Sequence, residues 1–192
     1  MVMTYSEMLP LGTQAPHFEL ADADGVMHSL RDAQGRDATL VMFICNHCPF
    51  VKHIREELAA LGSDYTADRV AIFAINSNDV EAYPQDGPDA MRQEAREMGY
   101  RFPYLLDADQ SIAKAYRAAC TPDFFVFDSD LRLAYRGQLD DSRPGNGKPV
   151  TGKDLRSALD AVIAGHPLPA QQTPSVGCNI KWRAGNAPDY FG

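Results

Sequence analysis

An apolar segment that leads directly into two cysteines and a proline most constrains how this chain can fold. Residues 39–44 are apolar after the first threonine, which is typical of a central strand covered on both faces. The segment Cys45-Asn46-His47-Cys48-Pro49 follows at once. Beyond it, apolar side chains recur at helical spacing: Phe50, Ile54, Leu58 and Leu61. The sequence therefore predicts a buried strand that carries both cysteines to the start of an amphipathic helix, whose first turn tolerates Pro49.

The same alternation of strand and helix continues along the chain. We expect strands at 70–75, 104–106 and 124–127, and helices at 88–98 and 111–118. Crossovers of this kind place parallel strands in one sheet, and a turn at 128–130 adds an antiparallel strand at 131–135. The predicted fold class is therefore α/β with a mixed sheet.

The two ends of the chain are expected to add a hairpin and a tail to this sheet. Asp24-Gly25 lies between apolar segments at 18–20 and 26–30, which is a strong hairpin signal. Near the other end, Thr151 and Asp154 resemble a capping box for a helix whose apolar residues are Leu155, Leu159, Val162 and Ile163. Residues 165–192, rich in proline and glycine, should then dock onto the domain.

Size and charge exclude several classes of protein. With 192 residues the chain is long enough for one self-sufficient domain, spanning residues 1–192. The net charge of −8 argues against partners bound by broad electrostatics, namely nucleic acids and anionic membranes. No apolar run approaches the roughly 20 residues that span a bilayer, and no secretory signal is evident, so we expect a cytoplasmic protein.

The cysteine spacing indicates redox chemistry. Two cysteines three residues apart in the first turn of a helix can close a small disulfide. The helix N-terminus favours a thiolate, so we expect Cys45 to be the exposed thiol with a lowered pKa and Cys48 to lie inside the helix. His47 between them can add positive charge or a hydrogen bond. Stabilising the thiolate in this way would make the pair oxidising.

A metal site is the main alternative for a lone Cys-x-x-Cys. Zinc requires four ligands, and the chain has no second Cys-x-x-Cys. His47, His53, Cys120 and Cys178 could complete a site only through an arrangement that the sequence does not reveal. We therefore expect no metal and no cofactor, and interpret His53 as a solvated residue. A non-enzymatic metal-binding or interaction module stays open as an alternative.

Four segments together resemble a known family. The strand, the Cys45–Cys48 pair and the helix, with Thr121-Pro122 before a later strand, are similar to the thioredoxin fold. The opening Leu11-Gly12-x-x-Ala15-Pro16-x-Phe18-x-Leu20 is similar to the redoxin branch that includes the AhpC/TSA peroxiredoxins. More narrowly, the chain resembles the peroxiredoxin-like thioredoxin-family proteins in the segments 45–51, 120–125, 140–146 and 177–182. The resemblance implies a thioredoxin-like fold, a mixed sheet with helices on both faces, and a cis-proline, Pro122, that faces the redox pair.

The resemblance also implies an activity and its partners. The leading function is thiol–disulfide oxidoreduction, in which Cys45 attacks a substrate disulfide, Cys48 resolves the mixed disulfide and Thr121 and Pro122 dock the substrate backbone. Its partners would be substrate proteins or small thiols, together with a recycling reductant. A peroxiredoxin-type peroxidase is the alternative enzyme. The assembly stays open, with a homodimer among the alternatives.

The chain departs from both relatives at positions that carry chemistry. Cys45, Val41 and Pro122 stand where peroxiredoxins have the Thr or Ser, Pro and Arg that activate peroxide, so we expect poor peroxide turnover. Thr39 stands where thioredoxin has its buried Asp, and Ile44 where it has a Trp before the pair. The usual base for resolving the mixed disulfide is therefore absent from its usual place.

Two further cysteines are candidates for accessory redox roles. By the resemblance, Cys120 approaches the redox pair, but inert packing is the favoured interpretation. Cys178 lies in the tail, where a structural thiol and a third redox thiol are equally weighted alternatives. Asp140 and Asp141 are interpreted as turn formers. Two aromatic residues, Trp182 and Phe191, are expected to anchor the tail.

Overall fold

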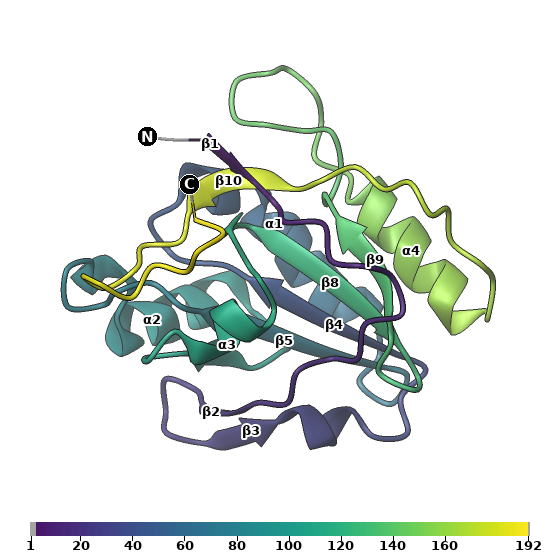
Figure 1. Cartoon of the computed structure of the whole chain (residues 1–192), viewed down its shortest axis with the longest axis horizontal. Helices are drawn as coiled ribbons and strands as arrows, with labels where there is room; N and C mark the ends of the chain where they lie inside the picture. The colour runs from purple at the N-terminus through teal and green to yellow at the C-terminus, as the bar shows by residue number, and fades with distance from the viewer. Residues whose placement is uncertain (1–2, 192) are drawn as a thin grey trace.

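Five strands form the central sheet of the protein, in the order β6–β5–β4–β8–β9 (Figure 1). The computed structural model describes residues 3–191. The sheet strands are β4 (Ala38–Phe43), β5 (Val70–Asn76), β6 (Tyr104–Leu106), β8 (Asp123–Asp128) and β9 (Leu133–Gly137). β4, β5 and β6 run parallel, whereas β8 is antiparallel to β4 and β9 is antiparallel to β8. The predicted mixed sheet is confirmed.

Helices cover both faces of this sheet (Figure 1). They are α1 (Pro49–Asp64), α2 (Pro88–Met98), α3 (Ser111–Ala115) and α4 (Lys153–Ile163), with short 3₁₀ turns η1 (Leu30–Ala33) and η2 (Pro84–Asp86). Apolar residues of α1, α2 and α4 pack on one face with Leu40 and Met42. On the opposite face, Val41 and Phe43 pack with α3 and η1. Because strand side chains alternate in direction, β4 supplies both cores and is fully buried.

The N-terminal hairpin forms as predicted. Strands β2 (Glu19–Ala21) and β3 (Met27–Ser29) pair antiparallel around the Asp24-Gly25 turn. Two expected elements have different bounds. The helix at 111–118 ends at Ala115, because Arg117 takes a positive φ of 50° that no helix continues. The strand expected at 131–135 begins at Leu133, since Leu131 lies in the preceding turn with φ 57°.

The capping box predicted for α4 is wrong. The N-cap is Gly152, in the left-handed region with φ 63°, and it carries no side-chain cap. The carboxylate of Asp140 instead accepts hydrogen bonds from the backbone N–H of Thr151, at 2.7 Å, and of Gly152, at 2.8 Å. Asp154 accepts from Gln138 at 2.7 Å. The buried Asp140 therefore holds the backbone just before α4 in place. It was expected only to form a turn.

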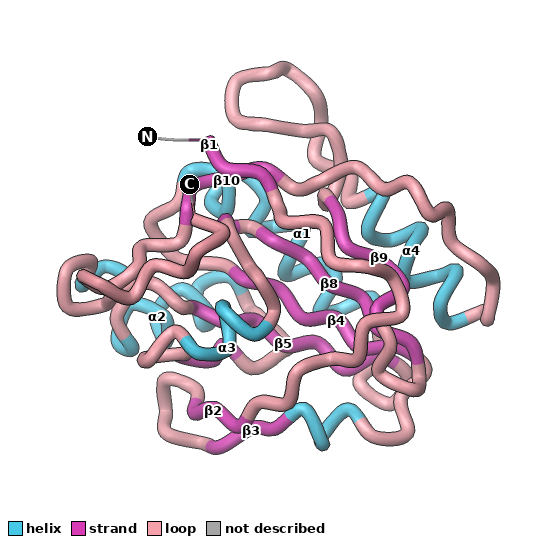
Figure 2. Tube along the Cα trace, in the orientation of Figure 1, coloured by secondary structure: helices cyan, strands magenta, loops and turns pink. Residues whose placement is uncertain are grey.

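The tail contains a strand that the sequence did not predict. β10 (Val176–Asn179) pairs antiparallel with β1 (Met3–Tyr5) on one side and with β7 (Cys120–Thr121) on the other. Figure 2 shows loop on either side of β10. Further along, Trp182 is half-buried and contacts Phe191, with ring centroids 6.5 Å apart. Strand β10 thus joins β1, near the start of the chain, to β7 in a separate three-stranded sheet.

Across residues 3–191, no helix has both the length and the apolar character that crossing a bilayer requires.

Candidate active site

Both cysteines of the Cys-x-x-Cys pair lie where strand β4 passes into helix α1. Cys45 is in the connecting loop, and Cys48 is the N-cap residue of α1 with Pro49 in the first turn. The thiols are free and buried, with Cys45 1% exposed and Cys48 0% exposed. The expectation that Cys45 is exposed is therefore wrong, because the loop is folded inward against β7 and η2.

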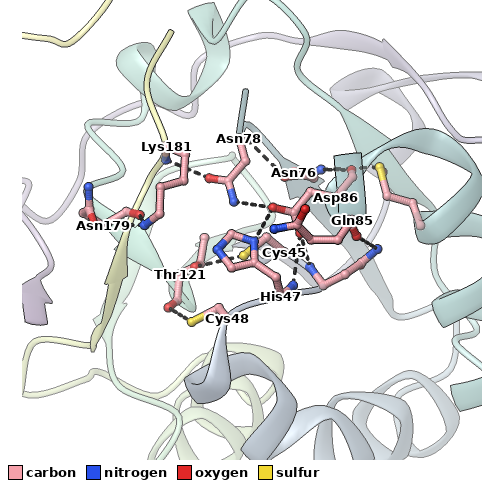
Figure 3. A network of polar contacts seen from close by, with 12 residues as sticks. Cys45, His47, Cys48, Asn76, Asn78, Gln85, Asp86, Thr121, Asn179 and Lys181 are labelled. Carbon is pink, nitrogen blue, oxygen red and sulfur yellow. Dashed lines mark hydrogen bonds and ion pairs between the residues drawn. The ribbon is translucent and has the colours of Figure 1, made fainter. Parts of the chain in front are cut away.

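Thr121 faces both sulfur atoms from the neighbouring strand (Figure 3). Its Oγ1 lies 3.4 Å from Cys45 Sγ, and its carbonyl oxygen lies 3.1 Å from Cys48 Sγ. The Thr121–Pro122 peptide bond is cis. The structure thus places Thr121 and Pro122 beside the pair, as the resemblance implies.

His47 is held by the carboxylate of Asp86, a residue that the sequence analysis did not single out. Its Nδ1 lies 2.5 Å from Asp86 Oδ2, and its backbone N–H donates to Asp86 Oδ1 at 3.0 Å. Tyr83 stacks on the other side of the imidazole, with centroids 5.4 Å apart and planes 10° apart. A donor nitrogen of His47 and an oxygen of Asp86 lie within 4.8 Å of Cys45 Sγ. Cys45, His47 and Asp86 therefore form one cluster, in which a carboxylate holds the imidazole beside a buried thiol.

Asp86 is fully buried yet stabilised as a carboxylate (Figure 3). Burial alone would raise its pKa, but hydrogen bonds from His47 and from Asn78, at 2.8 Å, lower the pKa overall. The backbone N–H of Asn46 adds another hydrogen bond at 2.9 Å. Thirty-nine residues separate His47 from Asp86, so only the tertiary fold brings them together.

The two thiols have opposite pKa shifts. The hydrogen bond to Cys48, burial and the nearby charge of Asp86 raise the pKa of Cys45 well above its ordinary value. The pKa of Cys48 is lowered, because Cys178 and Cys45 hydrogen-bond to its sulfur and the backbone N–H of Val51 points at it. The sequence predicted the lowered pKa at Cys45. The structure places it at Cys48, since Cys48 is the N-cap residue and Cys45 is the one beside a buried anion.

Only one of the two accessory cysteines contacts the redox pair. Cys178 lies in β10 directly opposite Thr121 and belongs to the same buried cluster as Cys45 and Cys48, and the nearby Cys48 raises the pKa of its thiol. Cys120 is fully buried, with its sulfur 3.5 Å from the carbonyl oxygen of Pro122. Burial raises the pKa of Cys120 well above its ordinary value, which suits an inert packed thiol.

His53 is not the solvated residue expected from the helix pattern. It is half-buried, and its Nε2 lies 2.5 Å from Ser142 Oγ. Ser142 Oγ in turn donates to the carbonyl oxygen of Lys148 at 3.1 Å. His53 therefore ties α1 to the loop before α4 and does not face the thiols.

Cys45, His47 and Asp86 are also ligand types that zinc accepts. A carboxylate offers about four lone-pair directions. In Asp86 the N–H groups of Asn46 and His47 occupy one oxygen, and Asn78 and the His47 ring occupy the other. With its acceptor sites used, Asp86 fits a hydrogen-bonded partner of His47 better than a metal ligand.

The match to a protein family covers most of this arrangement. Residues 11–136 match the AhpC/TSA family, a span that includes β4, α1, the cis-proline and β8. The chain belongs to the AhpC/TSA family. Among solved structures, it is similar to an uncharacterized conserved protein from Geobacillus kaustophilus (56% identity, 95% of this chain and 97% of that chain, TM-score 0.92). A hypothetical protein from Sinorhizobium meliloti 1021 is 53% identical, with coverage of 95% and 100% and a TM-score of 0.93.

More distant relatives share the thioredoxin-like fold. A putative thiol:disulfide interchange protein DsbE from Chlorobium tepidum is 18% identical, with coverage of 81% and 99% and a TM-score of 0.64. By sequence, the thiol-disulfide oxidoreductase ResA of Bacillus thuringiensis is 25% identical over 129 residues, which are 66% of this chain and 69% of that protein. The expected thioredoxin-like fold is therefore confirmed.

Cleavage of a peroxide O–O bond at a sulfur is assisted by a cationic group that stabilises the developing charge. Arg136 is buried, but its guanidinium lies over the Phe125 ring, on the face of the sheet opposite the Cys48 core. Arg143 lies near Pro122, and its donors bind Gln138, Asp140 and Ser142. Arg136 has unpartnered guanidinium nitrogens but lies on the wrong face, and Arg143 is engaged by the loop, so neither arginine is placed to polarise a peroxide at Cys48.

Proposed function

We propose that this protein is a thiol–disulfide oxidoreductase in which Cys45 attacks a substrate disulfide and Cys48 resolves the mixed disulfide. The observation that carries the proposal is the placement of both sulfurs against Thr121, with His47 and Asp86 beside Cys45. The names of the curated relatives, thiol-disulfide oxidoreductases ResA at 24–25% identity, support the same chemistry.

The surroundings of the two sulfurs assign the order of attack. Cys48 is enclosed by Cys45, by Cys178 and by the carbonyl group of Thr121. Cys45 neighbours the His47 side chain, which is 22% exposed and marks the route to solvent. A substrate sulfur therefore reaches Cys45 first, after a small outward movement of the 45–47 loop.

His47 then supplies the base that Cys45 needs. Because the pKa of Cys45 is raised, its proton must leave as the sulfur attacks, and a His47 nitrogen within 4.8 Å can take it through one bridging water. The new Cys45–substrate bond forms as the substrate S–S bond breaks. The departing substrate sulfur leaves as a thiolate and is protonated.

Cys48 completes the exchange because it already has thiolate character. Its sulfur attacks Cys45 Sγ in the mixed disulfide, forms the Cys45–Cys48 disulfide and releases the second substrate sulfur. Thr121 and Pro122 would hold the substrate backbone during both steps. We propose protein disulfides or small thiols as substrates, and a separate dithiol reductant that returns the pair to the reduced state.

The lowered pKa of Cys48 favours one second candidate, a thiol peroxidase. By the resemblance, Cys48 occupies the place of the peroxidatic cysteine. The candidate is weakened by the engaged donors of Arg143, by the position of Arg136 on the opposite face, and by Cys45 in place of the activating hydroxyl.

A disulfide-reduction assay separates the proposed oxidoreductase from a non-enzymatic metal-binding module. With dithiothreitol as reductant, the wild-type protein should accelerate reduction of a model protein disulfide, and Cys45→Ser should not. Zinc analysis of the same purified protein addresses the metal-binding module. If the protein did not accelerate reduction and contained stoichiometric zinc, the proposed enzyme function would be rejected in favour of the metal-binding module.

A further inference from the structure

The tail strand β10 brings a third buried thiol to the redox pair. Cys178 is 2% exposed and belongs to the same packed cluster as Cys45 and Cys48. In the antiparallel register it stands opposite Thr121, whose carbonyl oxygen lies 3.1 Å from Cys48 Sγ. Cys48 therefore has a thiol neighbour on each side: Cys45 from its own loop and Cys178 from the tail.

Gly177 makes this close approach possible. A Cβ atom at this position would lie 1.9 Å from the carbonyl oxygen of Thr121, so no other residue fits without a shift of the backbone. The glycine lets β10 pack tightly against β7 beside the cis-proline. The adjacent Cys178 is thereby fixed next to the sulfur of Cys48, and Figure 1 shows β10 passing beside the start of α1.

We propose that Cys178 is a third redox thiol that exchanges with the Cys45–Cys48 disulfide and moves it to Cys48–Cys178. This inference rests on the proposed function, because it begins from the disulfide that catalysis leaves behind. The sulfur of Cys178 attacks Cys48 Sγ, the Cys48–Cys178 bond forms, and the Cys45–Cys48 bond breaks with its electron pair on Cys45. The proton lost by Cys178 balances the proton gained by Cys45, and no outside oxidant is consumed.

The exchange gives the oxidised protein a property that a two-cysteine enzyme lacks. Cys45 regains its thiol while the oxidising equivalent stays inside the protein. A second disulfide can then attach to Cys45 as a mixed disulfide that Cys48 no longer resolves. Neighbouring Cys48 and burial raise the pKa of Cys178 in the reduced protein, and the Lys181 ammonium opposes this rise.

Oxidised glutathione provides the probe for this exchange. The full chain and its Cys178→Ser, Cys45→Ser and Cys120→Ser variants are incubated with excess oxidised glutathione, alkylated and mapped by mass spectrometry. In the wild type we expect a species with glutathione on Cys45 and a Cys48–Cys178 bridge. Cys178→Ser should lose this species completely, and Cys45→Ser, which cannot form the Cys45–Cys48 disulfide from which the exchange starts, should form no Cys48–Cys178 bridge.

Cys120→Ser is the matched control, since Cys120 is equally buried in the partner strand but lies next to Asn179 in the register. It should retain the wild-type pattern. If Cys178 is alkylated as a free thiol in the wild type while Cys45–Cys48 forms and turns over, the relay is overturned and the proposed function stands. If neither the Cys45–Cys48 bridge nor disulfide turnover is found, the proposed function fails, and the relay fails with it.

Discussion

The imidazole of His47 and the carboxylate of Asp86 are joined by a contact of 2.5 Å between Nδ1 and Oδ2. This contact fixes the orientation of the ring beside Cys45 and leaves its other nitrogen available. A carboxylate that orients a histidine base is the arrangement used to activate a nucleophile in many unrelated enzymes.

The first prediction separates the base from the residue that positions it. His47→Ala should lower kcat/KM for disulfide reduction by about 100-fold, the loss expected when a general base is removed. Asp86→Asn should lower the plateau rate and also move the pH profile to lower pH, because the Asp86 charge raises the pKa of Cys45.

Asp89→Asn is the control for this pair of variants. Asp89 lies three residues further along, and its side chain is 98% exposed. Its rate and pH profile should match the wild type. If Asp86→Asn had the same plateau rate as Asp89→Asn, Asp86 would have no role in catalysis.

The second prediction concerns where the reduced protein carries its thiolate. The pKa of Cys48 is lowered and that of Cys45 is raised, so Cys48 should be ionised at neutral pH and should remain so at mildly acidic pH. Ultraviolet thiolate absorbance at neutral pH should disappear in Cys48→Ser and persist in Cys120→Ser. A signal that persists in Cys48→Ser and disappears in Cys45→Ser would show that Cys45, not Cys48, is the thiolate.

The third prediction is poor peroxide turnover. Neither buried Arg136 nor the hydrogen-bonded Arg143 is placed to polarise an O–O bond at Cys48. Slow reaction of a thiolate with hydrogen peroxide is expected. A kcat/KM of roughly 10⁵ M⁻¹s⁻¹ or more, which is typical of efficient enzymes, would show that other residues build a peroxide site.

The fourth prediction links a buried acid to stability. Asp123 follows the cis-proline, is fully buried, and accepts a hydrogen bond from Ser6 at 2.6 Å. Burial raises the pKa of Asp123 from 3.8 to about 6 in the folded protein, against an opposing effect of Arg136. A raised folded-state pKa means that the stabilising contribution of Asp123 is complete below its unfolded pKa and is lost as the pH rises through about 6.

Urea unfolding of the wild type and Asp123→Asn checks this linkage. Between about pH 4 and about pH 7, the wild type should lose about 2 kcal/mol of unfolding free energy relative to the variant, which is most of the roughly 3 kcal/mol that a shift of about two pKa units represents. Parallel stability curves across this range would mean that the pKa of Asp123 is not raised. The pH dependence decides the test, because the variant also removes a counter-charge from Arg136.

The sheet and the redox pair could be predicted because their signals are local. The continuous apolar run of β4 and the helical periodicity after Pro49 each specify an element within a few residues. The position of Pro122 followed from the resemblance. Helix α4 was predicted, but its capping by Asp140 was missed, because that carboxylate approaches from a loop eleven residues earlier.

The missed parts of the site depend on contacts between distant segments. Asp86 lies in a turn flanked by Pro84 and Gly87, and such a sequence predicts only a loop. Its role becomes visible only when η2 packs against the 45–47 loop. Strand β10 has four residues, including Gly177, and follows several prolines. Such a segment forms a strand only because β1 and β7 supply partners on both sides, which local propensity does not encode.

Trapping of a mixed disulfide tests the central claim most directly. Each of Cys45→Ser and Cys48→Ser, reduced and then mixed with a disulfide-bonded substrate protein, is analysed by non-reducing electrophoresis and peptide mapping. Our account predicts that Cys48→Ser accumulates a substrate disulfide at Cys45, because the resolving thiol is gone, whereas Cys45→Ser traps no substrate. Accumulation of the mixed disulfide at Cys48 in Cys45→Ser, with none in Cys48→Ser, would reverse the two roles and contradict the account.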